Sequence, residues 1–193
     1  MRVVAGSARG RTLRAPPSGG TRPTSDRVRE AVFSILTSLG AVEGATVVDL
    51  FAGSGALGIE ALSRGAAHAT FVDHDGAAVD TIRANLTVLG PAETHATVVR
   101  GDAVRFAASV GAIDLCFADP PYAFAGWAGL LEGLAGSGFT GLAVLEAGTE
   151  VDCGPGWDAI RAKRYGGTVV QVVRPVSPDA RQTKPTPSDE RPG

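Results

Sequence analysis

The sequence has few of the residues on which several large classes of protein depend. Its 193 residues include two cysteines, Cys116 and Cys153, and three histidines. Two cysteines are too few for a disulfide framework, and the histidines lack the spacing of metal ligands, so we expect no metal site. The apolar runs are too short for a membrane-spanning helix. Because residues 1–4 lack the apolar core of a signal peptide, the expected location is the reducing cytoplasm.

A large excess of charge of either sign is also absent, since the formal net charge is −2. That sum hides a division along the chain. Residues 1–30 carry seven arginines and two acidic residues, residues 31–158 four basic and fifteen acidic residues, and residues 159–193 seven basic and three acidic residues. The net charges are therefore +5, −11 and +4. Such a division indicates either a polyanionic partner or chance clustering on solvated surfaces, and both interpretations stay open.

The composition divides the chain into three regions. A length of 193 residues, 44% of them hydrophobic, suits one domain with its own core. Residues 1–20 predict a basic β-hairpin, with strands over 2–5 and 12–15, followed by a linker rich in proline and glycine. Residues 21–174 predict the main domain. Residues 175–193, rich in proline and charge, predict a disordered tail. A small, self-contained chain of this size is expected to be a monomer.

The main domain alternates between helical patterns and short apolar runs. A first helix is expected after Thr24 or Ser25 as its N-cap, because apolar residues then recur with helical spacing. Strands are predicted over residues 46–51, 69–73, 96–100, 113–119 and 142–146, and helices near 56–64, 76–90, 103–109 and 126–135. Two more strands, over 158–164 and 168–174, predict a C-terminal antiparallel hairpin. The fold class expected is α/β, with a mostly parallel, seven-stranded, Rossmann-like sheet.

A glycine-rich loop follows the first strand of this sheet. Gly53, Gly55 and Gly58 satisfy the G-x-G-x-x-G spacing, in which glycines allow a tight turn and the close approach of a ligand. Asp73, at the end of the second strand, is placed to accept hydrogen bonds from ribose hydroxyls. The pattern fits NAD enzymes and S-adenosylmethionine (SAM) enzymes alike. Asp49 favours SAM, because a carboxylate before the loop attracts the methionine ammonium and repels a pyrophosphate.

A second motif, Asp119-Pro120-Pro121-Tyr122, follows the fourth strand and so lies on the same edge of the sheet as the glycine-rich loop. Asp119 and the Pro120 carbonyl are two acceptors that suit an exocyclic amino group, and Tyr122 offers a ring for stacking. Hydrogen bonds from both N–H groups draw the amine nitrogen towards tetrahedral geometry, with its lone pair aimed at a methyl donor. The motif therefore predicts methylation of a base amino group, on adenine or guanine.

Together the two motifs resemble those of the SAM-dependent amino-methyltransferases of nucleic acids. The stretch from Arg22 to Glu30 (RPTSDRVRE), with Phe33, and the stretch from Asp49 to Gly65 (DLFAGSGALGIEALSRG) are similar to the RsmD family of bacterial 16S rRNA guanine-N2 methyltransferases. The similarity runs from the arginine-rich N-terminal residues to about Arg174 and leaves only the predicted tail outside it. Two positions depart from the family pattern: Ser34 stands where Asn is usual, and Asp73 where many relatives have Glu.

The resemblance implies a SAM-dependent methyltransferase fold and a role for each motif residue. It implies SAM as cofactor and guanine 966 of 16S rRNA, within an assembling small ribosomal subunit, as target. The implied cofactor-binding residues are Thr24, Arg27, Asp49, Phe51, Ala52, Gly53, Ser54, Gly55, Asp73, Asp102, Ala103 and Asp119. The implied catalytic residues, which hold the guanine, are Asp119, Pro120, Pro121 and Tyr122. The candidates for RNA contacts are Arg9, Arg11, Arg14 and Arg22.

Several alternatives stay open at this point. Asp102 either faces the adenine amino group or caps the next helix, and Arg27 contacts either the cofactor carboxylate or a phosphate. Asp75 is a second candidate for the ribose. The basic residues of the last hairpin are either a second RNA contact or a solvated edge: Arg161, Lys163 and Arg164. The rival functions are adenine-N6 methylation of DNA or rRNA, an NAD-dependent oxidoreductase, and an rRNA-binding assembly factor without turnover.

Overall fold

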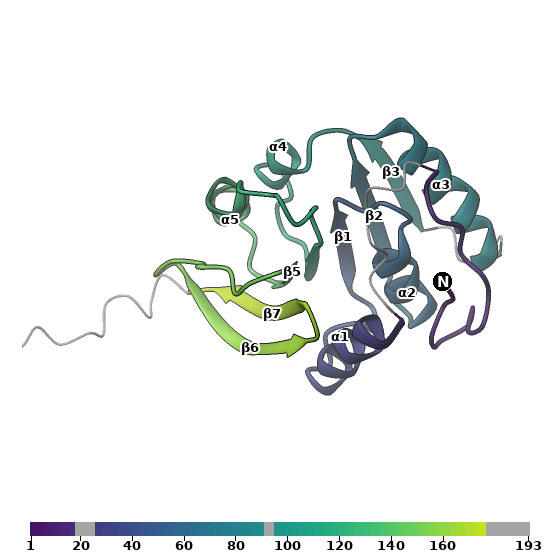
Figure 1. Cartoon of the computed structure of the whole chain (residues 1–193), viewed down its shortest axis with the longest axis horizontal. Helices are drawn as coiled ribbons and strands as arrows, with labels where there is room; N and C mark the ends of the chain where they lie inside the picture. The colour runs from purple at the N-terminus through teal and green to yellow at the C-terminus, as the bar shows by residue number, and fades with distance from the viewer. Residues whose placement is uncertain (18–25, 91–94, 177–193) are drawn as a thin grey trace, which may run out of the picture.

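A seven-stranded sheet forms the centre of the molecule, in the order β3-β2-β1-β4-β5-β7-β6 (Figure 1). The computed structural model describes residues 1–17, 26–90 and 95–176. The strands are β1 (Thr46–Leu50), β2 (His68–Asp73), β3 (Ala96–Arg100), β4 (Leu115–Ala118), β5 (Leu142–Ala147), β6 (Trp157–Tyr165) and β7 (Thr168–Pro175). The helices are α1 (Asp26–Ser38), α2 (Ala56–Ser63), α3 (Gly76–Leu86), the 3-10 helix η1 (Thr87–Leu89), α4 (Ala103–Ala107) and α5 (Trp127–Gly136). The predicted α/β class is confirmed.

The first five strands run parallel and carry the connections that create a ligand site. β1 pairs with β2 on one side and with β4 on the other, and β2 and β4 pair onward with β3 and β5. The chain therefore winds in one direction from β1 to β3 and then crosses to the other side of β1. In open α/β sheets, ligands bind beyond the carboxyl ends of the strands at such a reversal.

Helices cover both faces of the sheet, and each face has its own core. On one face, α1 and α2 bury apolar side chains against the sheet, and Phe33 of α1 lies 5.6 Å from Phe117 of β4, ring centre to ring centre. On the other face, α4 and α5 pack against β1, β4 and β5. Strands enclosed in this way are mostly apolar, which is why they read as nearly continuous apolar runs in the sequence.

The predicted C-terminal hairpin is confirmed. β7 pairs antiparallel with both β5 and β6, so it lies inside the sheet and is largely buried. β6 forms the edge, and most of its residues are exposed. Because β7 ends at Pro175, the sheet extends one residue into the region predicted as a tail. Residues 177–193 lie outside the described residues, so the predicted boundaries of the three regions stay predictions.

Residues 1–17 pack against α2 and α3 instead of joining the sheet (Figure 1). The predicted N-terminal hairpin pairs antiparallel, but as one isolated bridge between Arg2 and Thr12 and not as two regular strands. Helix side chains bind backbone groups of this segment, and one of them, the Ala5 N–H, would pair with residue 9 in a longer ladder but instead donates to Glu60 of α2 at 2.9 Å. Ser63 accepts from the Ala8 N–H at 3.0 Å, and Asn85 accepts from the Arg14 N–H at 2.8 Å.

Two further observations concern the helices. In the part of the chain that the structure describes, no helix has both the length and the hydropathy needed to cross a membrane. The predicted N-cap residues of α1, Thr24 and Ser25, lie outside the described residues, and so does Arg22. The described part of α1 nevertheless buries Val28, Val32 and Leu36, as the helical spacing predicts.

Candidate functional site

Acidic side chains gather at the carboxyl ends of neighbouring strands. Asp49 lies in β1, Asp73 ends β2, and Asp119 directly follows β4. A cavity of about 170 Å³ opens at this edge. Its lining residues are Pro16, Phe51, Gly53, Asp73, His74, Asp75, Ala78, Asp119 and Pro121. The structure therefore brings the glycine-rich loop and the Asp-Pro-Pro-Tyr motif to one cavity, as their positions in the sequence predict.

The glycine-rich loop has a backbone that few residues other than glycine adopt. Gly53 and Gly55 have φ values of 54° and 77°, and Phe51 has a φ of 60°, which is uncommon for a bulky residue. Gly58 serves packing instead, because a Cβ there would lie 2.3 Å from the Phe71 ring of β2. The last glycine of the motif thus allows α2 to approach the sheet closely, while Phe51 is a strained residue beside the cavity.

Carboxylates from the sheet hold this loop in place. Asp73 Oδ2 accepts a hydrogen bond from the Gly53 N–H at 2.8 Å, and Asp49 Oδ2 accepts from the Gly58 N–H at 2.9 Å. Asp73 Oδ1 accepts from the Asp75 N–H at 2.9 Å. Each carboxylate oxygen has capacity for a second bond. Asp73, which binds the Gly53 N–H of the loop, can therefore also accept hydrogen bonds from the hydroxyls of a bound ribose.

Asp49 is an acidic residue in an unfavourable electrostatic setting. It is 2% exposed, and burial raises the pKa of its carboxyl well above the ordinary value. The bond from Gly58 offsets this in part, and the charges of Asp119 and Asp73 raise the pKa further. Burial of like charges without a cation is costly. The site consequently fits a ligand that brings a positive charge to this edge of the sheet.

Several other residues predicted to bind the cofactor do not line the cavity. Ala52 and Ser54 are buried within the loop. Asp102 is exposed and accepts from the Arg105 N–H at 2.8 Å, so its role as N-cap of α4 is confirmed. The cavity lining includes neither Asp102 nor Ala103. Arg27 is exposed on α1 and is also outside this lining, and Thr24 lies outside the described residues. Their roles in cofactor binding stay predictions.

The two carboxylates predicted to bind the ribose, Asp73 and Asp75, lie two residues apart at the end of β2. Asp75 caps α3 by accepting from the Ala77 N–H at 3.0 Å, and it lines the cavity together with Asp73. His74, between them, brings Nδ1 within 3.5 Å of Asp73 Oδ1. Both carboxylates therefore stay candidates for contact with the ribose.

The Asp-Pro-Pro-Tyr motif forms a turn that ends on an exposed ring. Pro120 is buried, and the Pro121 carbonyl accepts from the Phe124 N–H at 2.8 Å. Tyr122 is 59% exposed, and its hydroxyl lies 3.0 Å from Thr168 Oγ1. The motif thus presents a carboxylate on the cavity wall and an aromatic face towards solvent, which suits a base that enters from outside.

Sequence reasoning missed the aromatic contact between the two motifs. Phe124 lies 5.0 Å from Phe51 and 5.3 Å from Trp127, ring centre to ring centre, and both pairs meet edge to face. Such pairs contribute about 0.5–1.5 kcal/mol beyond their burial. The strained Phe51 of the glycine-rich loop is therefore packed against the turn that follows Tyr122. A phenylalanine two residues after Tyr122 was the one available signal.

Glu60 of α2 is a second residue that the sequence did not reveal as important. It is fully buried and accepts from the Val4 N–H at 2.7 Å and the Ala5 N–H at 2.9 Å. Arg64 donates to it at 2.7 Å, and Arg29 Nε of α1 lies 3.7 Å away. One carboxylate thus joins the N-terminal segment (residues 1–17) to α1 and α2. An acidic residue in the apolar stretch ALGIEALS was the signal.

Asn85 of α3 connects the N-terminal segment to the glycine-rich loop. Its side chain is buried and bonds to both backbone groups of Arg14, at 2.8 Å and 2.9 Å. The same amide nitrogen donates to the Ser54 carbonyl at 2.9 Å. The segment continues to Pro16, which lines the cavity. The predicted RNA-binding segment is therefore also part of the wall of the predicted cofactor site.

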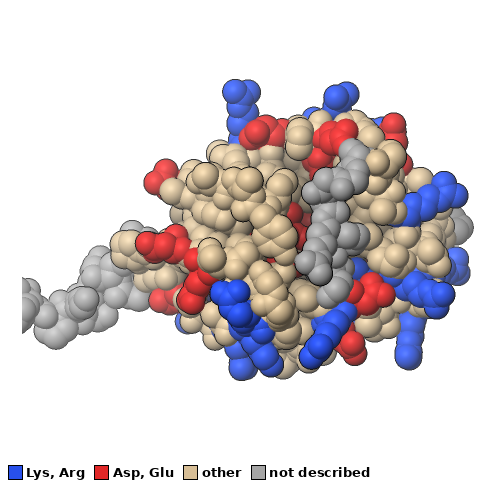
Figure 2. Space-filling view, viewed as in Figure 1, with Lys and Arg blue, Asp and Glu red and all other residues tan. Residues whose placement is uncertain are grey.

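Basic side chains lie on the segments that flank this site. Three candidate RNA-binding residues, Arg9, Arg11 and Arg14, are exposed, and so are Arg161 and Lys163 of β6. Figure 2 shows Lys and Arg side chains over the N-terminal segment, α1 and the β6–β7 hairpin, with acidic atoms visible in the hollow at the centre of the same face. Basic side chains on this face therefore lie beside the acidic edge of the sheet, although charges of both signs also lie elsewhere on its rim.

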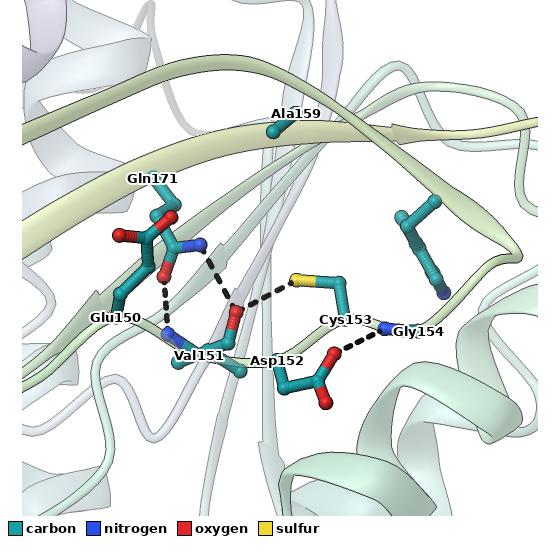
Figure 3. Close-up of a pocket in the computed structure, with 8 residues that line it drawn as sticks. Glu150, Val151, Asp152, Cys153, Gly154, Ala159 and Gln171 are labelled. Atoms are coloured by element: carbon teal, nitrogen blue, oxygen red, sulfur yellow. Dashed lines mark hydrogen bonds between the residues drawn. The ribbon is translucent and has the colours of Figure 1, made fainter.

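A larger cavity, of about 400 Å³, lies beside β6 and β7 (Figure 3). Gln171 bonds to both backbone groups of Val151 there, and Cys153 Sγ faces the Val151 carbonyl at 3.5 Å. Burial raises the pKa of the Cys153 thiol, and the charges of Asp152 and Glu150 add to this. A thiol kept protonated is a poor nucleophile, and no residue of either motif lines this cavity.

Neither attack on a base by the Cys116 thiol nor metal binding finds support in the described residues. Cys116 is fully buried in β4, and burial raises the pKa of its thiol, so it is unsuited to attack a base. Within residues 1–17, 26–90 and 95–176, no group of three or more His, Cys, Asp or Glu side chains could hold a metal ion.

Comparisons with known proteins agree with this geometry. The chain is 44% identical over 126 residues to the Bacillus subtilis (strain 168) protein named "Putative rRNA methyltransferase YlbH". The matched region covers 63% of this chain and 67% of the relative. It is 44% identical over 123 residues to "Ribosomal RNA small subunit methyltransferase D" of Escherichia coli (strain K12), with 63% and 60% covered. The matched region thus spans about two thirds or less of these relatives' own length.

Solved structures and a family model cover more of the chain. The structure described as "Putative methyltransferase yhhF from Escherichia coli" matches with a TM-score of 0.79 and 35% identity, over 91% of this chain and 97% of that one. The predicted SAM-dependent methyltransferase fold is thereby confirmed. The model of the family described as "Conserved hypothetical protein 95" matches residues 1–174. The chain belongs to this family, and its predicted membership of the RsmD family is confirmed.

Proposed function

We propose that this chain is a SAM-dependent methyltransferase that modifies the N2 amino group of a guanine in 16S rRNA. The observation that carries the proposal is the cavity that both motifs share. Phe51, Gly53 and Asp73 line it from the glycine-rich loop and β2, and Asp119 and Pro121 line it from the second motif. A methyl donor and a base amino group would therefore meet within one small space.

The charges around the cavity support SAM over a dinucleotide. Asp73, Asp75 and Asp119 line it, and Asp49 lies close enough for its pKa to respond to Asp119. SAM supplies a methyl group on a positively charged sulfur and carries an ammonium group as well. A pyrophosphate would meet like charges here, and like charges about 4 Å apart repel by several kcal/mol near a protein surface. The rival NAD-dependent oxidoreductase is therefore disfavoured.

The second motif supplies the groups that a base amine needs. Asp119 accepts from one N–H of the amine, and the Pro120 carbonyl accepts from the other. The Tyr122 ring, 59% exposed, replaces stacking that the base loses when it leaves its neighbours. These groups orient the nitrogen lone pair towards the methyl donor, so the protein acts mainly through positioning and electrostatics.

The names of the relatives support rRNA as the substrate. Both curated relatives are named as rRNA methyltransferases, and one name specifies the small subunit. The exposed arginines of the N-terminal segment match a polyanion, and that segment runs to the cavity wall at Pro16. We extend the proposal to an assembling small ribosomal subunit as the form in which the rRNA is modified.

A methyl-transfer assay tests the proposal directly. The purified chain is incubated with isotope-labelled SAM and small subunits that lack the modification, or with protein-free 16S rRNA, and the product nucleoside is identified by mass spectrometry. We expect N2-methylguanosine, formed faster on subunits than on free RNA. N6-methyladenosine as the sole product would overturn the guanine assignment. RNA binding without methyl transfer would instead support an assembly factor.

A matched pair of variants guards this assay against contaminating activity. Asp119→Asn removes the acceptor charge on the cavity wall, whereas Asp152→Asn makes the same chemical change beside the larger cavity. We expect product formation to be lost in the first variant and retained in the second. Equal activity in both would show that the product does not depend on Asp119 and would overturn its assigned role.

A further inference from the structure

Tyr122 is held by a part of the sheet that does not line the cofactor cavity. Its hydroxyl lies 3.0 Å from Oγ1 of Thr168, the first residue of β7, although the tyrosine is 59% exposed. An exposed tyrosine can bond to water and needs no protein partner. A bond to a buried side chain instead restricts the rotamers that the ring can adopt.

Thr168 is well placed to act as a rigid support. It is 8% exposed, and its branched Cβ leaves few χ1 rotamers in a strand. It pairs with Tyr165 of β6, and the next residue, Val169, pairs with Ala147 of β5. The antiparallel strands on both sides therefore fix the position of the threonine hydroxyl.

Gly148 supports the same ring from a second direction. A Cβ on this glycine would lie 3.3 Å from Tyr122 Cδ1, so the ring packs against bare backbone directly after β5. The Gly148 carbonyl accepts from Arg164 Nη1 of β6 at 3.3 Å. The ring is thus located at its hydroxyl by Thr168 and along its edge by Gly148, and both contacts come from the β5, β6 and β7 side of the sheet.

We propose that Thr168 is a positioning residue, which acts by holding Tyr122 in the orientation that receives the target base. The inference rests on the proposed function and deepens it, because it gives the antiparallel hairpin a role in substrate binding. A ring already oriented costs less entropy on binding, and a small misplacement of the base slows transfer strongly. Thr168 does not itself touch the base or the methyl donor.

The test removes each half of the contact without removing the ring. Thr168→Val keeps the shape of the side chain but not its hydroxyl, and Tyr122→Phe keeps the ring for stacking. We expect each to lower the single-turnover rate of rRNA methylation at saturating SAM by about 10-fold. The double variant should be no slower than either single variant, because both remove the same hydrogen bond. Thr168→Ser should restore most of the rate.

Two controls separate positioning from general destabilisation. Thr81→Val removes a hydroxyl that donates to the Ala77 carbonyl within α3, at 2.7 Å, and should leave the rate unchanged. SAM affinity and melting temperature should be equal in Thr168→Val and the parent. A parental rate in Thr168→Val, or additive losses in the double variant, would overturn the positioning role while leaving the proposed function intact. No methyl transfer by the parent would overturn both.

Discussion

The acidic edge of the sheet and the basic segments beside it differ in how their charges are used. Asp49 and Asp73 are 2% and 7% exposed and bond to backbone N–H groups of the glycine-rich loop. Arg9, Arg11 and Arg161 are exposed. Buried charges act at hydrogen-bond distance and are screened little by salt, whereas exposed charges are screened over about 8–10 Å. Salt concentration should therefore separate cofactor binding from RNA binding.

The sharpest test of the acidic edge is Asp119→Ala. Loss of a group aimed at the reacting atoms typically costs about 10²–10³-fold in turnover. We expect such a loss in kcat, with the salt dependence of RNA binding unchanged, because the basic segments are not altered. Filter binding at several salt concentrations and a methyl-transfer assay measure the two properties. A change in the salt dependence would mean that the two regions are not independent.

Glu60→Gln tests whether an acidic residue anchors the basic segment. The amide removes the charge that faces Arg64 and Arg29, and its NH2 group replaces one acceptor oxygen, so a donor then faces the N–H of Val4 or Ala5. Breaking a buried ion pair on one side costs about 3–5 kcal/mol in the free energy of unfolding. Urea unfolding measures this, and hydrogen exchange should show faster opening of residues 1–14. Glu132→Gln, at an exposed position on α5, is the matched control.

Asp49 predicts how pH acts on the acidic edge. Burial raises its pKa in the folded state, so between the unfolded-state and folded-state pKa values the folded protein binds more protons than the unfolded protein. The stability of the cofactor-free protein is therefore greatest below the unfolded-state pKa and is lost as pH rises through the folded-state pKa. Thermal unfolding across this range should show the decline, and Asp49→Asn should flatten it.

Asp49 also predicts that SAM affinity depends on pH in the direction opposite to stability. A bound ammonium favours the charged carboxylate, so SAM affinity should rise with pH over the range in which the free protein loses stability. Calorimetry should detect proton release on binding, and Asp49→Asn should abolish the release and lower the affinity by about 10-fold, equivalent to 1.36 kcal/mol. The same proton release in both proteins would assign it to another group.

Local patterns predicted the sheet and both motifs because each depends on residues close together in the chain. The glycine-rich loop spans residues 49–58, and the second motif follows one strand, so their meeting requires only that parallel strands end at one edge. β7 extends one residue beyond the predicted range 168–174 and ends at Pro175. The proline is tolerated there as the last residue, where it pairs with Trp157 of the edge strand.

The remaining site residues could not be predicted because their contacts join distant parts of the chain. Glu60 bonds to residues 55 and 56 positions away, Asn85 to a residue 71 away, and Thr168 to a residue 46 away. Nothing in a single sequence pairs such positions. The regular hairpin expected over residues 2–15 fails for the same reason, since its backbone donors bond to α2 and α3 side chains that local patterns do not bring near.

The smallest expected effects are in the basic segments, and they decide whether both segments contact RNA. Each phosphate contact that is lost lowers the slope of log affinity against log salt by about one. Arg9→Ala with Arg11→Ala should reduce the slope by about two, and Arg161→Ala with Lys163→Ala by a similar amount if β6 also binds. SAM affinity should be unchanged in both pairs. An unaltered slope in the first pair would show that the N-terminal arginines are a solvated surface, and that the segment serves the cavity wall through Pro16 alone.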